Sequence, residues 1–368
     1  MTGWPLACLL FAAVVAVLTA TVWGWGRLAG PGFRKLAARV VALVLCQALV
    51  TLSVLTVINR HFGFYGTWGE LAGAAGVGGH LVQNQDRGGD DVAAKLIRRK
   101  PEVSMGGTPK RDGRLDTVDI RGPRSGLHAR AYIYLPPQYF QQGGRRHFPV
   151  SVVFSGYPGA QRNLVSQVRV PQTARDEAKA GRVQPMVYVM LRPSMVKGRD
   201  TECLDIPGGP QTATFLTQDM PEAVRSAYRV SGDRRGWGVF GLSTGGYCSL
   251  KLAMRHSDVF SKAASLSGYY GAIKDITTGD LYGGSQAVRN ENDLFWRLQH
   301  RPQPPISVLV TTSQVGEKNK DETQRFLSLV RPPMRASSLV LDSGGHNFQT
   351  WKRILPQVLR WMSQGLTV

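Results

Sequence analysis

The segment 241–245 (Gly-Leu-Ser-Thr-Gly) constrains the fold of this chain more than any other stretch. It follows an apolar, strand-like run, 236–240, and it leads into a helical pattern over 247–254. A serine on such a sharp strand-to-helix turn has its hydroxyl lifted clear of the backbone, and the flanking glycines avoid collisions in so tight a turn. The pattern predicts a nucleophile elbow with Ser243 at its tip, and the alternative is a plain glycine-rich loop.

A nucleophilic serine needs a base, because a hydroxyl is nearly inert at neutral pH until an imidazole accepts its proton. In α/β-hydrolases the acid and the histidine follow the serine in the chain, which leaves His256, His300 and His346. His256 ends the predicted elbow helix and His300 lies in a proline-rich loop. His346 follows an apolar strand, 338–341, and so lies at a carboxyl edge, where such sheets carry their chemistry. We predict His346 as the base; the alternative is a loop histidine that caps the next helix.

The acid that orients the imidazole should follow the strand predicted at 306–311 and precede the histidine. Glu317 lies in the polar turn just after that strand and is the favoured candidate. Asp321 and Glu322 fit the first turn of the next helix, where a helix dipole favours acids, and Asp342 is too close to the histidine in sequence. Asp321 stays open as the second candidate.

An oxyanion hole requires two backbone donors near the nucleophile. One is the N–H of the residue after it, Thr244. The other is expected after the β-branched apolar run 150–154, where Gly156 allows a close approach and Tyr157 N–H is the candidate donor. The alternative interpretation of this segment is a Gly-Pro turn with no catalytic role.

Four separated segments resemble the putative-esterase family, which includes esterase D and the antigen 85 mycolyltransferases of actinobacteria. The segments, in the family's order, are 214–222 (Thr-Phe-Leu-Thr-Gln-Asp-Met-Pro-Glu), 241–246 (Gly-Leu-Ser-Thr-Gly-Gly), 265–269 (Ser-Leu-Ser-Gly-Tyr) and 343–348 (Ser-Gly-Gly-His-Asn-Phe). The resemblance covers roughly 116–362. It implies an α/β-hydrolase with Ser243 and His346 in a triad, a glutamate acid that matches Glu317, and oxyanion donors at Tyr157 and Thr244. The segment 199–205 occupies the place of a substrate-side loop in that family; we assign it no ligand, and the alternative interpretation is a solvated polar loop.

The N-terminal region carries two apolar stretches, 4–25 and 37–58, each long enough to cross a bilayer. Residues 1–60 hold no acid, and the short connection between the stretches is basic. Because positive loops stay in the cytoplasm, we expect a multi-pass protein of the cell membrane, with the loop inside and everything after Arg60 outside. A cleaved signal peptide is the alternative for the first stretch, but no Lys or Arg precedes it.

We expect three parts: a membrane anchor, 1–60; a juxtamembrane segment and tether, 61–113; and a catalytic domain, 114–368. The tether is rich in glycine and charge, with one short helix expected at 91–99, and the aromatic segment 61–70 is expected at the membrane surface or on the catalytic domain. From Thr117 onward, strands come to alternate with helices. This pattern predicts an α/β fold with a mainly parallel sheet and helices on both faces.

The net charge of the 368-residue chain is +20, and about +15 of it falls after residue 60. An outward basic domain is expected to be drawn to the membrane and to anionic envelope polymers, although a genomic arginine bias would give the same excess. No nucleic-acid module is visible, so we expect no nucleic-acid partner. No metal-ligand spacing and no nucleotide fingerprint occurs, so we expect no cofactor. In an oxidising compartment, Cys203 and Cys248 are candidates for a disulfide.

These observations favour a membrane-anchored, extracytoplasmic serine esterase that forms an acyl-enzyme on Ser243 and acts on an ester or acyl-lipid substrate. One alternative is an acyltransferase of the cell envelope, mycolyltransferase-like, that moves the acyl group to a sugar or lipid alcohol. The second alternative is a hydrolase fold that binds without chemistry.

Overall fold

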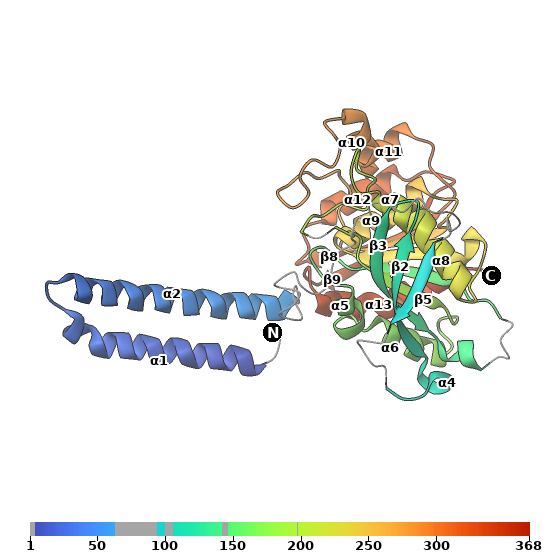
Figure 1. Ribbon diagram of the computed structural model, residues 1–368. Coiled ribbons are helices and arrows are strands. Elements are labelled where there is room, and N and C mark those ends of the chain that lie inside the picture. Colours follow the sequence, from blue (N-terminus) through green and yellow to red (C-terminus); the bar gives the residue numbers. More distant parts are fainter. Residues whose placement is uncertain (1–3, 63–93, 100–105, 142–145, 197) are drawn as a thin grey trace, which may run out of the picture. The chain divides into compact units, whose positions relative to one another are not determined.

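The structure, a computed structural model, describes residues 4–62, 94–99, 106–141, 146–196 and 198–368. The chain divides into two compact units, Met1–Ala75 and Gly76–Val368 (Figure 1). The aromatic segment expected at 61–70 and most of the expected tether lie outside the described residues.

The first unit is a pair of long helices that pack side by side, α1 (Trp4–Leu28) and α2 (Phe33–Phe62) (Figure 1). Within them, Pro5–Leu28 and Phe33–Asn59 are long and apolar enough to cross a membrane, with mean hydropathies of 2.4 and 2.5. Their apolar side chains are largely exposed, as in Phe11 and Val22, whereas the core helix of a soluble protein would bury them. Both helices contain the stretches predicted from the sequence.

The second unit contains a sheet whose nine described strands are arranged in the order β1-β2-β3-β5-β4-β6-β7-β8-β9. The first four strands in that order pair antiparallel, and β5, β4 and β6 to β9 run parallel. The strands are β1 Lys95–Arg99, β2 Arg114–Gly122, β3 Leu127–Leu135, β4 Val150–Phe154, β5 Val187–Leu191, β6 Trp237–Leu242, β7 Lys262–Leu266, β8 Ser307–Val315 and β9 Arg335–Ser343.

Helices cover both faces of the sheet because its central strands are apolar on both sides. In β5, Val187, Val189 and Leu191 join one core cluster, and Tyr188 and Met190 join the other. The first cluster lies under α8, α9, α11 and α12, and the second lies under α5, α6 and α13 (Figure 1). The helices are α4 Pro109–Asp112, α5 Arg162–Ser166, α6 Val170–Lys179, α7 Thr212–Thr214, α8 Met220–Ala227, α9 Thr244–Arg255, α10 Gln286–Glu291, α11 Leu294–His300, α12 Lys320–Leu329 and α13 Phe348–Ser363, with a π-helical turn at Phe215–Asp219 and 3-10 turns at Pro137–Phe140 and Arg234–Gly236.

The predicted α/β-hydrolase architecture is confirmed, with two local corrections. The helix expected at 91–99 is wrong where the structure describes it, because Lys95–Arg99 is the edge strand β1, paired antiparallel with β2. Leu96 packs against the core and Arg98 forms an ion pair with Asp116, so this short charged run satisfies the backbone of the β2 edge. The second correction concerns helices α10 and α11, which lie between β7 and β8 and were not predicted from the sequence.

Candidate active site

Ser243 lies on the turn between β6 and α9 with backbone angles of φ 55° and ψ −122°. A left-handed φ is costly for a residue with a side chain and persists only where the surroundings impose it. Here the N–H of Ser243 donates to Leu266 O at 2.9 Å, and its carbonyl accepts from the next turn of α9. A Cβ on Gly241 would lie 2.3 Å from Gly245 O, and one on Gly245 would lie 2.5 Å from Ser155 O. The backbone thus forms the elbow that the sequence predicted, and both glycines are required by close packing.

Glu317 and His346 meet at the ends of β8 and β9. The distance between His346 Nδ1 and Glu317 Oε2 is 3.6 Å, and the glutamate side chain is 3% exposed against 49% for the histidine. The two loops are held together because Gly344 N–H donates to Val315 O at 2.9 Å. Glu317 faces Nδ1 of the imidazole, which leaves Nε2 available for a serine hydroxyl.

The His346 ring also contacts the first turn of α13. Trp351 contacts it edge-to-face, with ring centroids 5.1 Å apart, and donates from Nε1 to Ser267 Oγ at 3.0 Å. A ring braced in this way has few alternative rotamers, which favours one orientation of the imidazole.

The other candidates for acid and base lie elsewhere. Asp321 and Glu322 are exposed in the first turn of α12, as expected for residues that interact with a helix dipole. His256 follows α9 directly, and burial lowers the pKa of its imidazole. His300 is the last residue of α11 rather than part of a loop, and its ring stacks on Trp296 with centroids 4.6 Å apart.

The expected oxyanion segment follows β4 and lies against the elbow. A Cβ on Gly156 would lie 3.2 Å from Ser243 Cβ, so the backbone that leads into Tyr157 approaches the nucleophile closely. Thr244 is the first residue of α9 and is 6% exposed. Strands β4 and β6 are parallel neighbours in which Phe154 is paired with Gly241, so both loops leave the sheet at the same level.

Ser243, Tyr157, Glu317 and His346 therefore all follow parallel strands of one sheet. The carboxyl ends of parallel strands meet at one edge, which is where open α/β sheets bind their ligands. Among the described residues, no group of three or more His, Cys, Asp or Glu side chains is placed to hold a metal ion.

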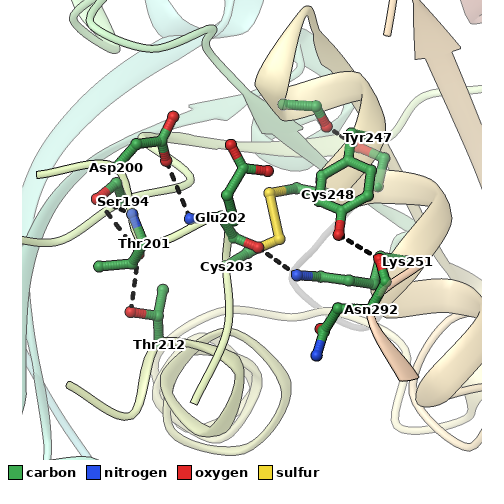
Figure 2. The surroundings of a disulfide bond; sticks show 12 residues. Ser194, Asp200, Thr201, Glu202, Cys203, Thr212, Tyr247, Cys248, Lys251 and Asn292 are labelled. Atoms are coloured by element: carbon green, nitrogen blue, oxygen red, sulfur yellow. Dashed lines mark hydrogen bonds between the residues drawn. A yellow bond between two sulfur atoms is a disulfide. The ribbon is translucent and has the colours of Figure 1, made fainter. Parts of the chain in front are cut away.

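The alternative interpretation of 199–205 as a solvated polar loop is wrong, because most of its residues are buried. Asp200 and Glu202 are each 2% exposed, and Cys203 forms a disulfide with Cys248 of α9 (Figure 2). Lys251, one helical turn further along α9, is 1% exposed and donates to the carbonyl oxygen of Glu202.

Burial dominates the electrostatics of this loop. It raises the pKa of the Asp200 and Glu202 carboxyls and lowers the pKa of the Lys251 ammonium. The Glu202 carboxylate accepts from Tyr269 Oη at 2.5 Å, and the Tyr269 ring stacks on Tyr247 with centroids 4.8 Å apart. This cluster was not predicted from the sequence, although two acids beside a cysteine, and a lysine close to Cys248 on the elbow helix, were visible signals.

Comparisons with known proteins agree with this fold. Residues 124–362 match the family described as "Putative esterase". An uncharacterised protein of Corynebacterium glutamicum is 27% identical over 251 residues, which cover 65% of this chain and 58% of that protein. The chain thus spans little more than half the length of this relative.

Several solved structures have a similar fold. A ferulic acid esterase superimposes with a TM-score of 0.58 at 18% identity, covering 75% of this chain and 100% of that chain. An S-formylglutathione hydrolase from Agrobacterium tumefaciens has a TM-score of 0.58 at 13% identity, covering 74% and 100%. A fluorophosphonate-binding serine hydrolase from Staphylococcus aureus has a TM-score of 0.54 at 16% identity, covering 68% and 98%. The family match over most of the catalytic region shows that this chain belongs to the putative-esterase family, and the solved structures share its α/β-hydrolase fold.

Proposed function

We propose that this protein is a membrane-anchored esterase that forms an acyl-enzyme on Ser243, with His346 as base and Glu317 as the acid that orients it. The observation that carries the proposal is the contact of 3.6 Å between Glu317 and His346 at the same sheet edge as the elbow. A buried carboxylate beside an imidazole stabilises the positive charge that the imidazole acquires during such a reaction.

The chemistry follows the two halves of acyl transfer. Ser243 Oγ attacks the ester carbonyl while His346 accepts its proton, and the oxyanion accepts hydrogen bonds from the N–H groups of Tyr157 and Thr244. The tetrahedral intermediate then breaks its bond to the alcohol oxygen, and His346 returns the proton to that leaving group. Water, deprotonated by His346, attacks the acyl-enzyme, and the carboxylic acid leaves as Ser243 recovers its proton.

Hydrolysis is favoured over transfer to another alcohol by the exposure of the base. The His346 side chain is 49% exposed, so water reaches the group that activates the second nucleophile. An acyltransferase must keep water from its acyl-enzyme. An envelope acyltransferase remains the alternative outcome of the test, and a hydrolase fold that only binds is the other.

The membrane setting rests on separate observations. The two N-terminal helices have the length and composition of membrane spans, and the loop between α1 and α2 is flanked by Arg27, Arg34 and Lys35. Positive loops favour the cytoplasm, which would put residues 114–368 outside. The Cys203–Cys248 disulfide supports an oxidising compartment for this part of the chain. The basic surface then favours anionic lipid head groups or envelope polymers as neighbours.

The full-length protein in detergent micelles is assayed with p-nitrophenyl esters of increasing acyl length, with and without glucose as acceptor. We expect the same turnover with and without glucose. Ser243→Ala should reduce this turnover at least about 10³-fold, since the nucleophile is lost. Ser328→Ala, an exposed serine on α12, is the matched control and should keep wild-type turnover. Acylated glucose as the main product would favour the acyltransferase, and full turnover by Ser243→Ala would refute the mechanism.

A further inference from the structure

The backbone segment 266–268, at the carboxyl end of β7, is connected to all three proposed triad residues, although it takes no part in the proposed proton transfers. Its first residue supports the nucleophile, because the N–H of Ser243 donates to Leu266 O at 2.9 Å. Strands β6 and β7 are parallel neighbours in which Leu242 is paired with Leu266, so the two strands end side by side. The position of the elbow therefore depends on the end of β7.

Ser267, the first residue after β7, is held in an unusual backbone conformation. Its φ is 55°, the same value as at Ser243, and the residue is 5% exposed. A left-handed φ is costly for a residue with a side chain and persists only where the surroundings impose it. Here the Ser267 N–H donates to Thr311 Oγ1 of β8 at 3.2 Å. Two neighbouring strands, β6 and β7, are thus each followed by a serine in the left-handed region.

The Ser267 hydroxyl connects this segment to the base. Its Oγ accepts from Trp351 Nε1 at 3.0 Å, and the Trp351 ring contacts His346 edge-to-face with centroids 5.1 Å apart. Trp351 is 6% exposed, so its indole N–H would be costly to leave without an acceptor. The hydroxyl therefore fixes the ring against which the imidazole lies.

The acid is connected to the same segment through Asn319, which comes two residues after Glu317. Asn319 Nδ2 donates to Gly268 O at 2.9 Å, and Asn319 Oδ1 accepts from Thr312 Oγ1 of β8 at 2.8 Å. The asparagine amide thus joins the turn that carries the acid to the backbone that follows β7. Elbow, base and acid are in this way connected through three consecutive residues.

We propose that Ser267 is a positioning residue for the triad. Its hydroxyl holds the tryptophan that contacts His346, and its backbone segment holds the elbow and the acid loop in register with that ring. The inference rests on the proposed function. The triad residues are far apart along the chain, and the rate depends steeply on their mutual position, since a displacement of about 1 Å costs about 10²-fold. A change at Ser267 should therefore lower kcat and leave substrate binding nearly unchanged.

The test uses the full-length protein with Ser267→Ala, which removes the hydroxyl and keeps the backbone bonds of the segment. Because those bonds remain, we expect kcat to fall about 10-fold, less than for a displacement of about 1 Å. KM should stay within about threefold of wild type, as for an effect confined to the transition state. Labelling of Ser243 by a fluorophosphonate also requires the oriented imidazole and should slow by a similar factor.

Ser265→Ala is the matched control on β7. Ser265 is 1% exposed, and its Oγ has no hydrogen-bond partner within the part of the chain that the structure describes, so we expect wild-type kcat. Ser267→Gly is the second variant, because glycine adopts a left-handed φ without cost and lacks the same hydroxyl. It should show the same loss in kcat, and it decides the question if Ser267→Ala does not fold.

A double-mutant cycle tests whether the hydroxyl acts through the tryptophan. Trp351→Phe keeps an aromatic ring and removes the N–H donor, and we expect it to lower kcat about 10-fold. Groups that act through one hydrogen bond are not additive, so Ser267→Ala combined with Trp351→Phe should lose about 10- to 30-fold. Losses that multiply to about 100-fold would mean independent effects and would overturn the proposed connection.

The outcomes separate this inference from the proposed function. Ser243→Ala with full turnover refutes the function itself. If Ser243→Ala is inactive while a folded Ser267 variant keeps kcat and the labelling rate within about twofold of wild type, only the positioning role is overturned. A lower melting temperature with unchanged kcat would also overturn it, since that result describes a purely structural residue. An equal loss of kcat in Ser265→Ala would overturn it too, because any change in this strand would then have the same effect.

Discussion

Replacing Glu317 with glutamine removes the negative charge behind His346 with almost no change in shape. At 3.6 Å, two unit charges attract by about 4 to 5 kcal/mol in an effective dielectric constant of ~20. The histidine side chain is 49% exposed, so solvent reduces this energy to about half. The imidazolium forms in the transition state, and each 1.36 kcal/mol corresponds to tenfold in rate. We therefore expect Glu317→Gln to lower kcat by about 30-fold to 70-fold.

The assay is steady-state hydrolysis of p-nitrophenyl butyrate by the full-length protein in detergent. KM should stay within about threefold of wild type, because the substrate does not contact the carboxylate. Glu322→Gln, the same change on the exposed first turn of α12, should leave kcat unchanged. The reasoning is refuted if Glu317→Gln keeps kcat within threefold of wild type, or if Asp321→Asn lowers it more.

Two further predictions concern the membrane topology and the stability of the domain. Alkaline phosphatase fused after Val368 should be active and a fusion at Gly30 should be inactive, because alkaline phosphatase needs an oxidising compartment. The reverse pattern would contradict the proposed topology. Arg182 and Arg360 hold the pKa of Glu177 at about 2 instead of 4.5, so its ion pairs stabilise the fold above pH 4.5 and lose that effect as the pH falls through 2. Since both arginines are more than a third exposed, Glu177→Gln should lower the free energy of unfolding by only about 1 to 2 kcal/mol at pH 7 in urea titrations, and an equal loss at pH 2 would refute the reasoning.

The elbow was predictable because its constraints are local. The β-turn-α geometry, the glycines at 241 and 245 and the following helix are all encoded within 20 residues. The strand 150–154 was also predicted at its observed bounds, since a β-branched run buried on both faces gives a clear signal. The order of serine, acid and histidine along the chain reduced the number of candidates for the acid and the base. The structure brings two of the remaining candidates, Glu317 and His346, into contact.

The features that the sequence analysis missed depend on long-range contacts. Strand β1 exists because β2 offers an edge to pair with, and nothing in Lys95–Arg99 itself distinguishes a strand from a short charged helix. The loop 199–205 is rich in polar residues, and its burial follows from the disulfide to α9 and from partners far along the chain, such as Tyr269. The polar composition of the loop predicts that it is exposed to solvent. It is buried because residues far along the chain provide hydrogen-bond partners for its polar groups.

The central claim is that Ser243 becomes covalently acylated with His346 as its base. The most direct measurement is mass spectrometry of the full-length protein after reaction with a fluorophosphonate, followed by peptide mapping. The account predicts one adduct on Ser243, formed quickly by the wild-type protein, formed far more slowly by His346→Ala, and absent in Ser243→Ala. Labelling at another residue, or labelling of Ser243 at an unchanged rate in His346→Ala, would contradict it.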